Sequence, residues 1–241
     1  MVSIADIIRQ SWNLYISKFK KYLPILAAIF GITSVFEILD IYFIEISKLA
    51  DFWKTGFLIT TGLLTYLLTF AITVILIFFS NKLLNNKEAS VSLQEIKQVF
   101  LPSLLISILV ALITIGGFLL FIVPGVLFMV WYAFASYMAI LEKKSGVKLL
   151  SESRELSRGR FWPVFGRLAA PNIFWAIISY LVMAGIFNVL GLILNKGFNV
   201  SQTTLALSII SSLISNLVAA FFAPLYVIGM TIVYRAVRSS K

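Results

Sequence analysis

The sequence predicts an all-α integral membrane protein in which six transmembrane helices form three hairpins, each preceded by a cytoplasmic amphipathic helix at the membrane interface. Composition is the first reason: 60% of the 241 residues are hydrophobic and 12% are charged, against about 45–50% and about 25% in soluble domains. The mean hydropathy of +0.99 is the second. The third is that the basic residues, which give a net charge of +10, stand between long apolar stretches. One globular core could not bury so much apolar surface.

The six spans follow from length, since a bilayer core of about 30 Å needs about 20 apolar residues in a helix. The third and fourth spans are separated only by Pro124-Gly125, a turn dipeptide, which predicts an antiparallel hairpin. No cleavable leader pattern precedes the first span, so we expect that span to stay in the membrane. We treat the chain as a single polytopic domain, 1–241, with spans at about 23–44, 56–80, 102–122, 125–141, 170–194 and 204–233.

Three amphipathic segments, at 3–20, about 91–100 and about 147–161, precede the hairpins and are typical of helices that lie among lipid headgroups. The first carries Ile4, Ile8, Trp12, Tyr15 and Phe19 on one face. The second begins with Ser92-x-x-Glu95, a capping-box pattern. In the third, Leu149, Leu150, Leu156 and the Phe161-Trp162 pair are expected to face lipid. Amphipathic patterning beside a membrane span is also common without this role.

The distribution of basic residues predicts the orientation. Seventeen Lys and Arg fall on the side that holds both termini and the segments after the second and fourth spans. The other side holds only Lys48, Lys54 and Lys196. Because basic loops stay in the cytoplasm, we expect a multi-pass protein of the cell (plasma) membrane with both termini cytoplasmic.

Two motifs resemble those of a broad group of bacterial and archaeal six-span membrane proteins. One is Pro124-Gly125, followed by an aromatic-rich span that ends at Glu142; the other is Ser153-x-x-Leu156-x-x-Gly159-x-x-Trp162. That group includes the membrane domain of some glycerophosphoryl diester phosphodiesterases, and most of its members have no assigned activity. The resemblance implies the six-span layout. It does not carry over the phosphodiesterase activity, which needs histidine and acidic side chains around a metal, because this chain has no histidine.

Glu37 and Asp40 are the sharpest candidates for chemistry inside the membrane. They lie three residues apart and share a helix face near the outer end of the first span. Intramembrane carboxylates are candidate ion or proton sites. Near the far interface, however, a carboxylate costs little free energy, so a structural role is also open to it. We favour the structural interpretation and keep transport as the alternative.

Stripes of hydroxyl side chains run along three spans: Thr61, Thr65, Thr69 and Thr73 in the second, Ser103 and Ser107 in the third, and Ser208, Ser211, Ser212 and Ser215, with Asn216, in the sixth. Small residues four apart let helices approach closely, and a polar path through the protein would use the same pattern. Helix packing is the more common use.

The segment 142–167 carries a concentration of basic residues that predicts contact with anionic lipid headgroups or with a protein partner. The positive-inside rule alone would also place basic residues there. The predicted contact residues are Lys143, Lys144, Lys148, Arg154, Arg158, Arg160, Trp162 and Arg167.

These patterns favour a non-enzymatic membrane protein, a lipid-contacting scaffold or accessory subunit, over a small-solute or ion transporter that uses Glu37 and Asp40. With neither cysteine nor histidine, the sequence offers no common nucleophile–base pair or metal-ligand cluster. We therefore expect no enzyme activity, cofactor, metal site or nucleic-acid partner, and leave open a membrane-protein partner or a homo-oligomer. A lipid enzyme built on Glu142 with Ser151 or Ser153 ranks third.

Overall fold

The computed structural model describes residues 2–45, 50–87, 90–193 and 205–240, and every regular element within these ranges is a helix. Six stretches of helix are long and apolar enough to cross a membrane. The prediction of an all-helical chain with six candidate spans is therefore confirmed. Lys48 and Lys196, two of the three basic residues expected on the non-cytoplasmic side, lie outside the described residues.

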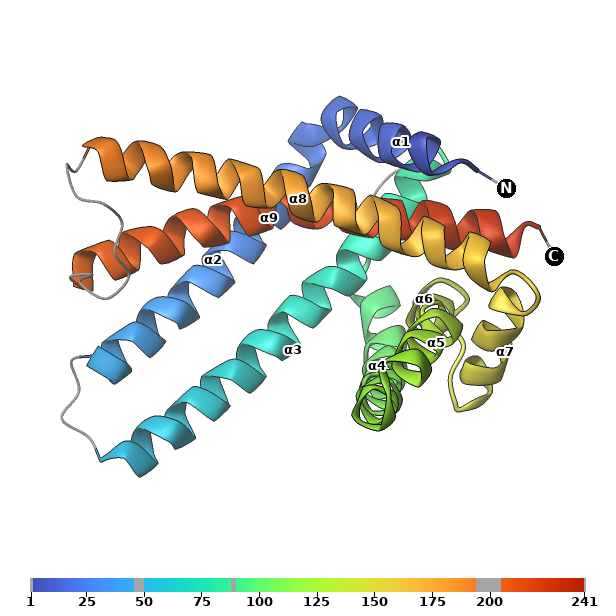
Figure 1. The fold of residues 1–241 in the computed structure, drawn as a ribbon, viewed down its shortest axis with the longest axis horizontal. Coiled ribbons are helices and arrows are strands. Elements are labelled where there is room, and N and C mark those ends of the chain that lie inside the picture. The colour runs from blue at the N-terminus through green and yellow to red at the C-terminus, as the bar shows by residue number, and fades with distance from the viewer. Residues whose placement is uncertain (1, 46–49, 88–89, 194–204, 241) are drawn as a thin grey trace. The chain divides into compact units, whose positions relative to one another are not determined.

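Figure 1 labels the helices in chain order. Several continue through a proline, which a spanning helix tolerates where neighbouring helices, hydroxyl side chains or a local change of helix geometry satisfy the freed backbone group. Their bounds are α1 Ile4–Ser17, α2 Phe19–Glu45, α3 Asp51–Leu84, α4 Leu93–Leu120, α5 Ile122–Tyr132, α6 Ala135–Leu141, α7 Lys148–Ser157, α8 Phe161–Ile193 and α9 Leu205–Arg238.

The chain divides into two compact units. The first unit consists of Met1–Lys18, Thr73–Ile173 and Leu225–Lys241, and the second of Phe19–Ile72 and Phe174–Pro224. Helices α3, α8 and α9 each contribute one part to either unit.

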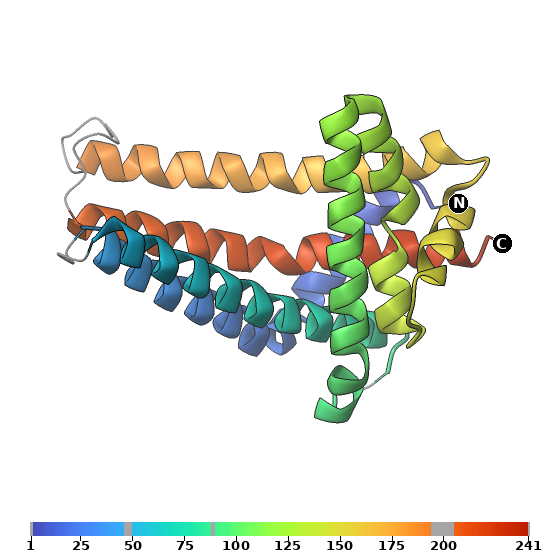
Figure 2. The same ribbon diagram turned by 90° about the horizontal axis from the view of Figure 1, so that it is seen from below.

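In the first unit, α4 packs against α5 and α6, and α7 packs against the same two helices (Figure 2). The side chains of Phe134, Met138, Leu149 and Leu156 are fully buried among these elements. Where such helices lie in lipid, which is as apolar as these side chains, close van der Waals packing stabilises their contact. The leucines of α7 thus pack into the protein, and the expectation that Leu149, Leu150 and Leu156 face lipid is wrong.

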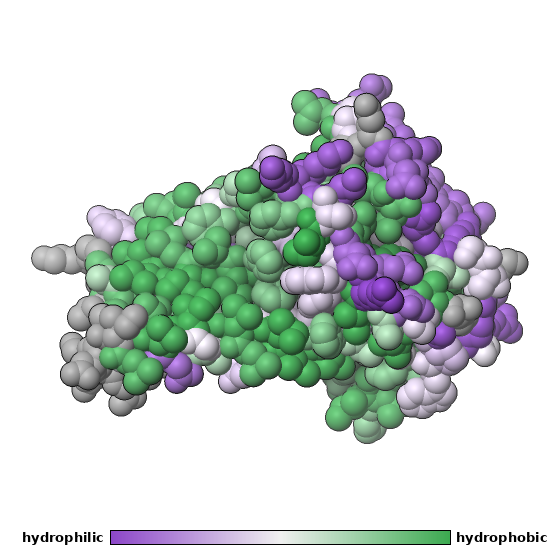
Figure 3. Space-filling view, turned by 90° about the horizontal axis from the view of Figure 1, so that it is seen from above, coloured by the Kyte–Doolittle hydropathy of each residue, from purple (hydrophilic) through white to green (hydrophobic). Residues whose placement is uncertain are grey.

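Helix α1 confirms the expected start near residue 3. The Ser3 hydroxyl caps the helix by accepting a bond from the Asp6 amide, at 3.1 Å. Its buried face carries Ile7, Ser11 and Tyr15, whereas Trp12 is largely exposed. Figure 3 shows hydrophilic side chains gathered over α1 and around the two termini in the first unit.

The chain reverses at Phe121 and not at Pro124-Gly125. Phe121 has an extended backbone (φ −162°, ψ 158°), and Pro124 lies in the first turn of α5, where a missing N–H costs no helical bond. Gly125 allows a close approach, because a Cβ there would lie 2.4 Å from the Phe118 ring. The third candidate span therefore ends, and the fourth begins, a few residues earlier than expected.

The segment 91–100 is not a separate interfacial helix. Ser92 and Glu95 form the predicted capping box, but α4 continues from Leu93 through Pro102 without a break. The segment 147–161 is also shortened: α7 ends at Ser157, and the backbone turns at Gly159 with a φ of +73°.

The second unit presents much of its apolar side-chain area outward. Val35, Leu63, Tyr180 and Leu181 are all more than half exposed. Apolar side chains dominate this unit's surface on the face drawn in Figure 3. Such a surface is unfavourable in water and favourable against hydrocarbon, which agrees with helices that face lipid.

Candidate lipid-binding site

Two serines of α7 hold this helix against the interruption between α5 and α6. The Ser153 hydroxyl donates to the Trp131 carbonyl oxygen at 2.7 Å and accepts from the Phe134 amide at 3.2 Å. The Ser157 hydroxyl donates to the Val130 carbonyl oxygen at 3.3 Å. A helix end leaves backbone carbonyl groups without helical partners, so the serines satisfy groups that the end of α5 exposes.

This packing places Arg154 over the indole of Trp131, with the guanidinium carbon 4.3 Å from the ring centroid. The two side chains border a hollow of about 510 Å³, which we call the arginine hollow. Its wall combines apolar and polar groups, including those of Leu127, Arg158 and Phe161, and the carboxylate of Glu155, which pairs with Arg158 at 3.1 Å. When a planar guanidinium stacks on an aromatic ring, its N–H groups still point outward in the guanidinium plane. This arrangement of donors suits phosphate oxygens.

A second hollow of about 440 Å³, the lysine hollow, shares Ser151 and Arg154 with the first. Lys148 and Tyr132 also line it. Lys148 is exposed, and neither Lys148 nor Arg154 has an ion-pair partner among the residues that the structure describes. The structure thus brings Lys148, Arg154 and Arg158 to neighbouring walls, as the sequence analysis grouped them.

The other predicted contact residues have different surroundings. Arg160 donates to the Ser240 hydroxyl at 2.7 Å, and Arg167 donates to the Val2 carbonyl oxygen at 2.7 Å. These two arginines therefore hold the chain termini. Lys143 and Trp162 are exposed and line neither hollow.

Lys144 belongs to a cluster around Glu142, which it contacts at 2.9 Å while also contacting Glu152 at 2.7 Å. Glu142 further accepts bonds from the Tyr234 hydroxyl and, at 3.0 Å, from Arg238. Partial burial raises the pKa of Glu142, but the bonds from Tyr234 and Lys144 and the Arg238 charge outweigh that effect and lower it overall.

The expected pairing of Glu142 with Ser151 or Ser153 is not formed. Ser151 donates to the Lys148 carbonyl oxygen, and Ser153 bonds to the backbone of Trp131 and Phe134. Glu142 joins the C-terminal part of α9 to the segment after α6, which is a structural role. The arrangement gives no support to a lipid enzyme at this position.

The second unit holds Glu37 with two neutral donors from α9. The Ser212 hydroxyl donates to Glu37 Oε1 at 2.9 Å, and the Asn216 amide donates to Oε2 at 2.6 Å. Ser34 lies one turn earlier on α2; it is buried, and its hydroxyl has no partner among the described residues. Both oxygens of the carboxyl group therefore have hydrogen-bond donors, and no cation is needed. These bonds stabilise Glu37 without the interfacial position that we expected.

Asp40 accepts a bond from the Thr61 hydroxyl at 2.7 Å. The Thr65 and Thr69 hydroxyls donate to carbonyl oxygens four residues earlier in α3, a local pattern that needs no solute path. This favours the packing interpretation of the threonine stripe. Within the described ranges, no group of three acidic side chains gathers where it could hold a metal ion.

Three features of these sites were absent from the sequence prediction. Trp131 carries no site signal in the sequence, because it lies near the middle of the predicted span 125–141 and not at an end, where an aromatic residue is typical of the membrane interface. The backbone bonds of Ser153 depend on the end of α5 at Tyr132. No proline or glycine lies near that position in the sequence to indicate it. The pairing of Glu37 with Ser212 joins residues 175 apart in the sequence.

Comparison with known proteins gives no relative for this chain: no protein-family model, curated protein sequence or solved structure matches it.

Proposed function

We propose that this chain is a non-enzymatic, multi-pass protein of the plasma membrane that binds anionic lipid headgroups through the exposed side of α7. It acts as a scaffold or accessory subunit. In this proposal, the six spans form three hairpins, α1 and α7 lie at the cytoplasmic interface, and both termini are cytoplasmic.

Arg154 is the residue that carries the proposal. It is exposed, stacks on Trp131 and borders two hollows, and Lys148 and Arg158 each line one of them. A basic residue near an anionic membrane surface contributes about 1 kcal/mol to lipid binding. The structural alternative, that these charges only set the orientation, does not explain a preformed hollow around a stacked guanidinium.

Native mass spectrometry tests this by titrating detergent-solubilised protein with phosphatidylglycerol and with phosphatidylcholine. We expect the wild type to retain phosphatidylglycerol preferentially, and Arg154→Glu to lose that preference. Lys97→Glu is the matched control, because Lys97 is exposed on α4 and outside both hollows. Equal retention by Arg154→Glu and wild type would refute the headgroup site.

Orientation has its own test, since the chain contains no cysteine. Single variants Asn86→Cys and Ser145→Cys should resist an impermeant thiol reagent added to intact cells. Asn199→Cys, at a position outside the described residues, should react. Labelling of the Ser145→Cys variant from outside would overturn the cytoplasmic placement.

A transporter or channel is the second candidate function, favoured by Glu37. Its two carboxyl oxygens face neutral donors in spanning helices, and Ser34 adds a buried hydroxyl without a partner among the described residues. Proteoliposomes with internal pH-sensitive and sodium-sensitive dyes, placed under an imposed membrane potential, test ion flux. Transport predicts a flux that Glu37→Gln with Asp40→Asn abolishes; equal signals from wild type and protein-free vesicles would refute ion transport.

A further inference from the structure

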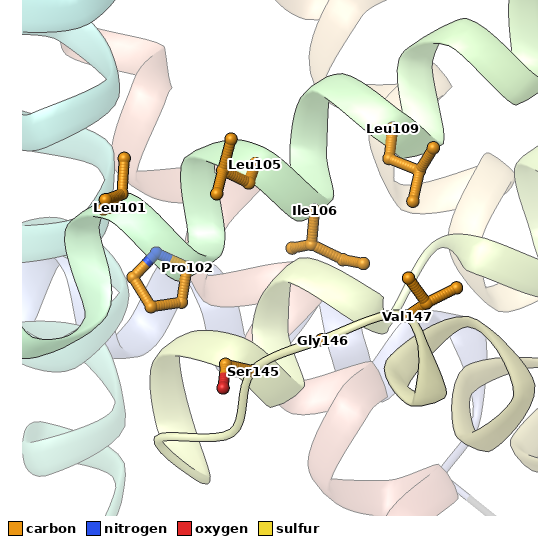
Figure 4. A pocket seen from close by; sticks show the side chains of 8 residues that line it. All are labelled: Leu101, Pro102, Leu105, Ile106, Leu109, Ser145, Gly146 and Val147. Carbon is orange, nitrogen blue, oxygen red and sulfur yellow. The ribbon is translucent and has the colours of Figure 1, made fainter.

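A third hollow of the first unit continues the two beside α7. It has a volume of about 300 Å³ and lies between α4 and the segment after α6 (Figure 4). We call it the leucine slot. It shares Val147 with the lysine hollow, which in turn shares Ser151 and Arg154 with the arginine hollow. The three hollows therefore form a series with a basic end and an apolar end.

One wall of the leucine slot is a stripe on α4. Leu101, Leu105 and Leu109 are spaced four residues apart, which places them on one helix face. Leu101 and Leu105 are each 59% exposed, so this wall is open to an apolar occupant. The stripe begins near the start of α4 and runs along the helix toward its middle.

The opposite wall is the chain at Ser145, Gly146 and Val147 (Figure 4). Gly146 has a φ of +92°, a conformation that other residues rarely adopt. Apart from Gly146 itself and its two chain neighbours, no atom of the described residues lies within 4 Å of the position that a Cβ would take there. The turn therefore leaves open space beside the slot, and Val147 leads directly to Lys148 and the basic end.

We infer that these hollows bind one anionic diacyl phospholipid, with its phosphate between Lys148 and Arg154 and the start of one acyl chain in the leucine slot. This inference rests on the proposed function and specifies its ligand. Lys148 and Arg154, which have no ion-pair partner among the described residues, suit a phosphate. The apolar stripe that Val147 joins to them suits a hydrocarbon chain. Free phosphate would leave the slot without a role, and a helix with a diameter of about 10–12 Å is too wide for it.

The experiment compares two bulky substitutions on α4 by native mass spectrometry with phosphatidylglycerol. Leu105→Trp fills the slot, and we expect it to reduce lipid retention by about tenfold. Leu112→Trp is the matched control, because Leu112 is exposed on the same helix but does not line the slot; it should retain lipid as the wild type does. Inorganic phosphate at equal concentration should not displace the lipid.

The outcomes separate the two proposals. If Arg154→Glu loses lipid while Leu105→Trp retains it, the headgroup site stands and the acyl slot is refuted. If Arg154→Glu also retains lipid, the proposed function fails.

A photoreactive phosphatidylglycerol with a diazirine near the ester end of one chain gives a second measurement on the unmodified protein. Cross-links at Leu101–Leu109 or Val147 are expected. Cross-links confined to other helices would overturn the slot, even if Leu105→Trp failed to fold.

Discussion

The carboxylates around α7 in the first unit and those of Glu37 and Asp40 in the second unit are satisfied in opposite ways. Around α7, Glu142, Glu152 and Glu155 each contact a cation within about 3 Å. In the second unit, Glu37 and Asp40 receive bonds only from hydroxyl and amide donors among the described residues.

The difference shows how each environment satisfies a carboxyl group. Exposed ion pairs are inexpensive to form and contribute little, because water already solvates both charges. Inside a span, a hydrogen bond has no water to replace it, and losing one partner leaves the other unsatisfied. The neutral bonds of the second unit should therefore contribute more to stability than the ion pairs of the first.

The largest expected effect comes from removing a donor to Glu37. Asn216→Leu deletes the 2.6 Å bond to Oε2 and leaves a carboxyl oxygen without a partner, at a cost of about 3 kcal/mol in the free energy of unfolding. Thermal unfolding of the detergent-solubilised protein measures this. Adding Glu37→Leu removes the unsatisfied group, so the double variant should recover much of the loss. Equal stability of the single variant and wild type would refute this contrast between the units.

The next effect concerns the interruption between α5 and α6. Ser153→Ala removes one part-buried bond to the Trp131 carbonyl and one buried bond from the Phe134 amide, at a cost of about 2 kcal/mol. Ser151→Ala is the matched control, because Ser151 is exposed and, among the described residues, its hydroxyl bonds only within its own helix; it should change stability by less than about 0.5 kcal/mol. Comparable losses in both variants would show that Ser153 has no special role.

Some parts of the structure could be predicted from the sequence, and others could not. Apolar length alone indicated six spans, and Ser92 with Glu95 indicated the start of α4, because both signals are local in sequence. The reversal at Phe121 was missed because Pro124 and Gly125 serve equally well in a turn and in a first helical turn. The partners of Glu37 could not be predicted from the sequence. Polar stripes indicate which face of a helix is suited to contact, but they do not indicate which helices contact each other.

A smaller effect depends on pH. Hydrogen bonds and neighbouring cations lower the pKa of Glu142 in the folded protein. Its carboxylate therefore stabilises the fold at pH values above the ordinary pKa of about 4.3, and that contribution is lost as the pH falls through the lowered pKa. Glu142→Gln should be less stable than wild type at neutral pH, with the difference shrinking as the solution is acidified. A constant difference across that range would contradict the assignment.

The smallest expected effect on stability comes from Arg158, whose ion pair with Glu155 is 74% exposed on the arginine side. Arg158→Gln should change the free energy of unfolding by less than about 0.5 kcal/mol. Because Arg158 lines the arginine hollow, the same variant should weaken phosphatidylglycerol retention by about fivefold, the equivalent of about 1 kcal/mol. Lys97→Gln, measured beside it, should change neither quantity. A large loss of stability with unchanged lipid retention would reverse the roles assigned to this surface, since the charge would then support the fold and not the ligand.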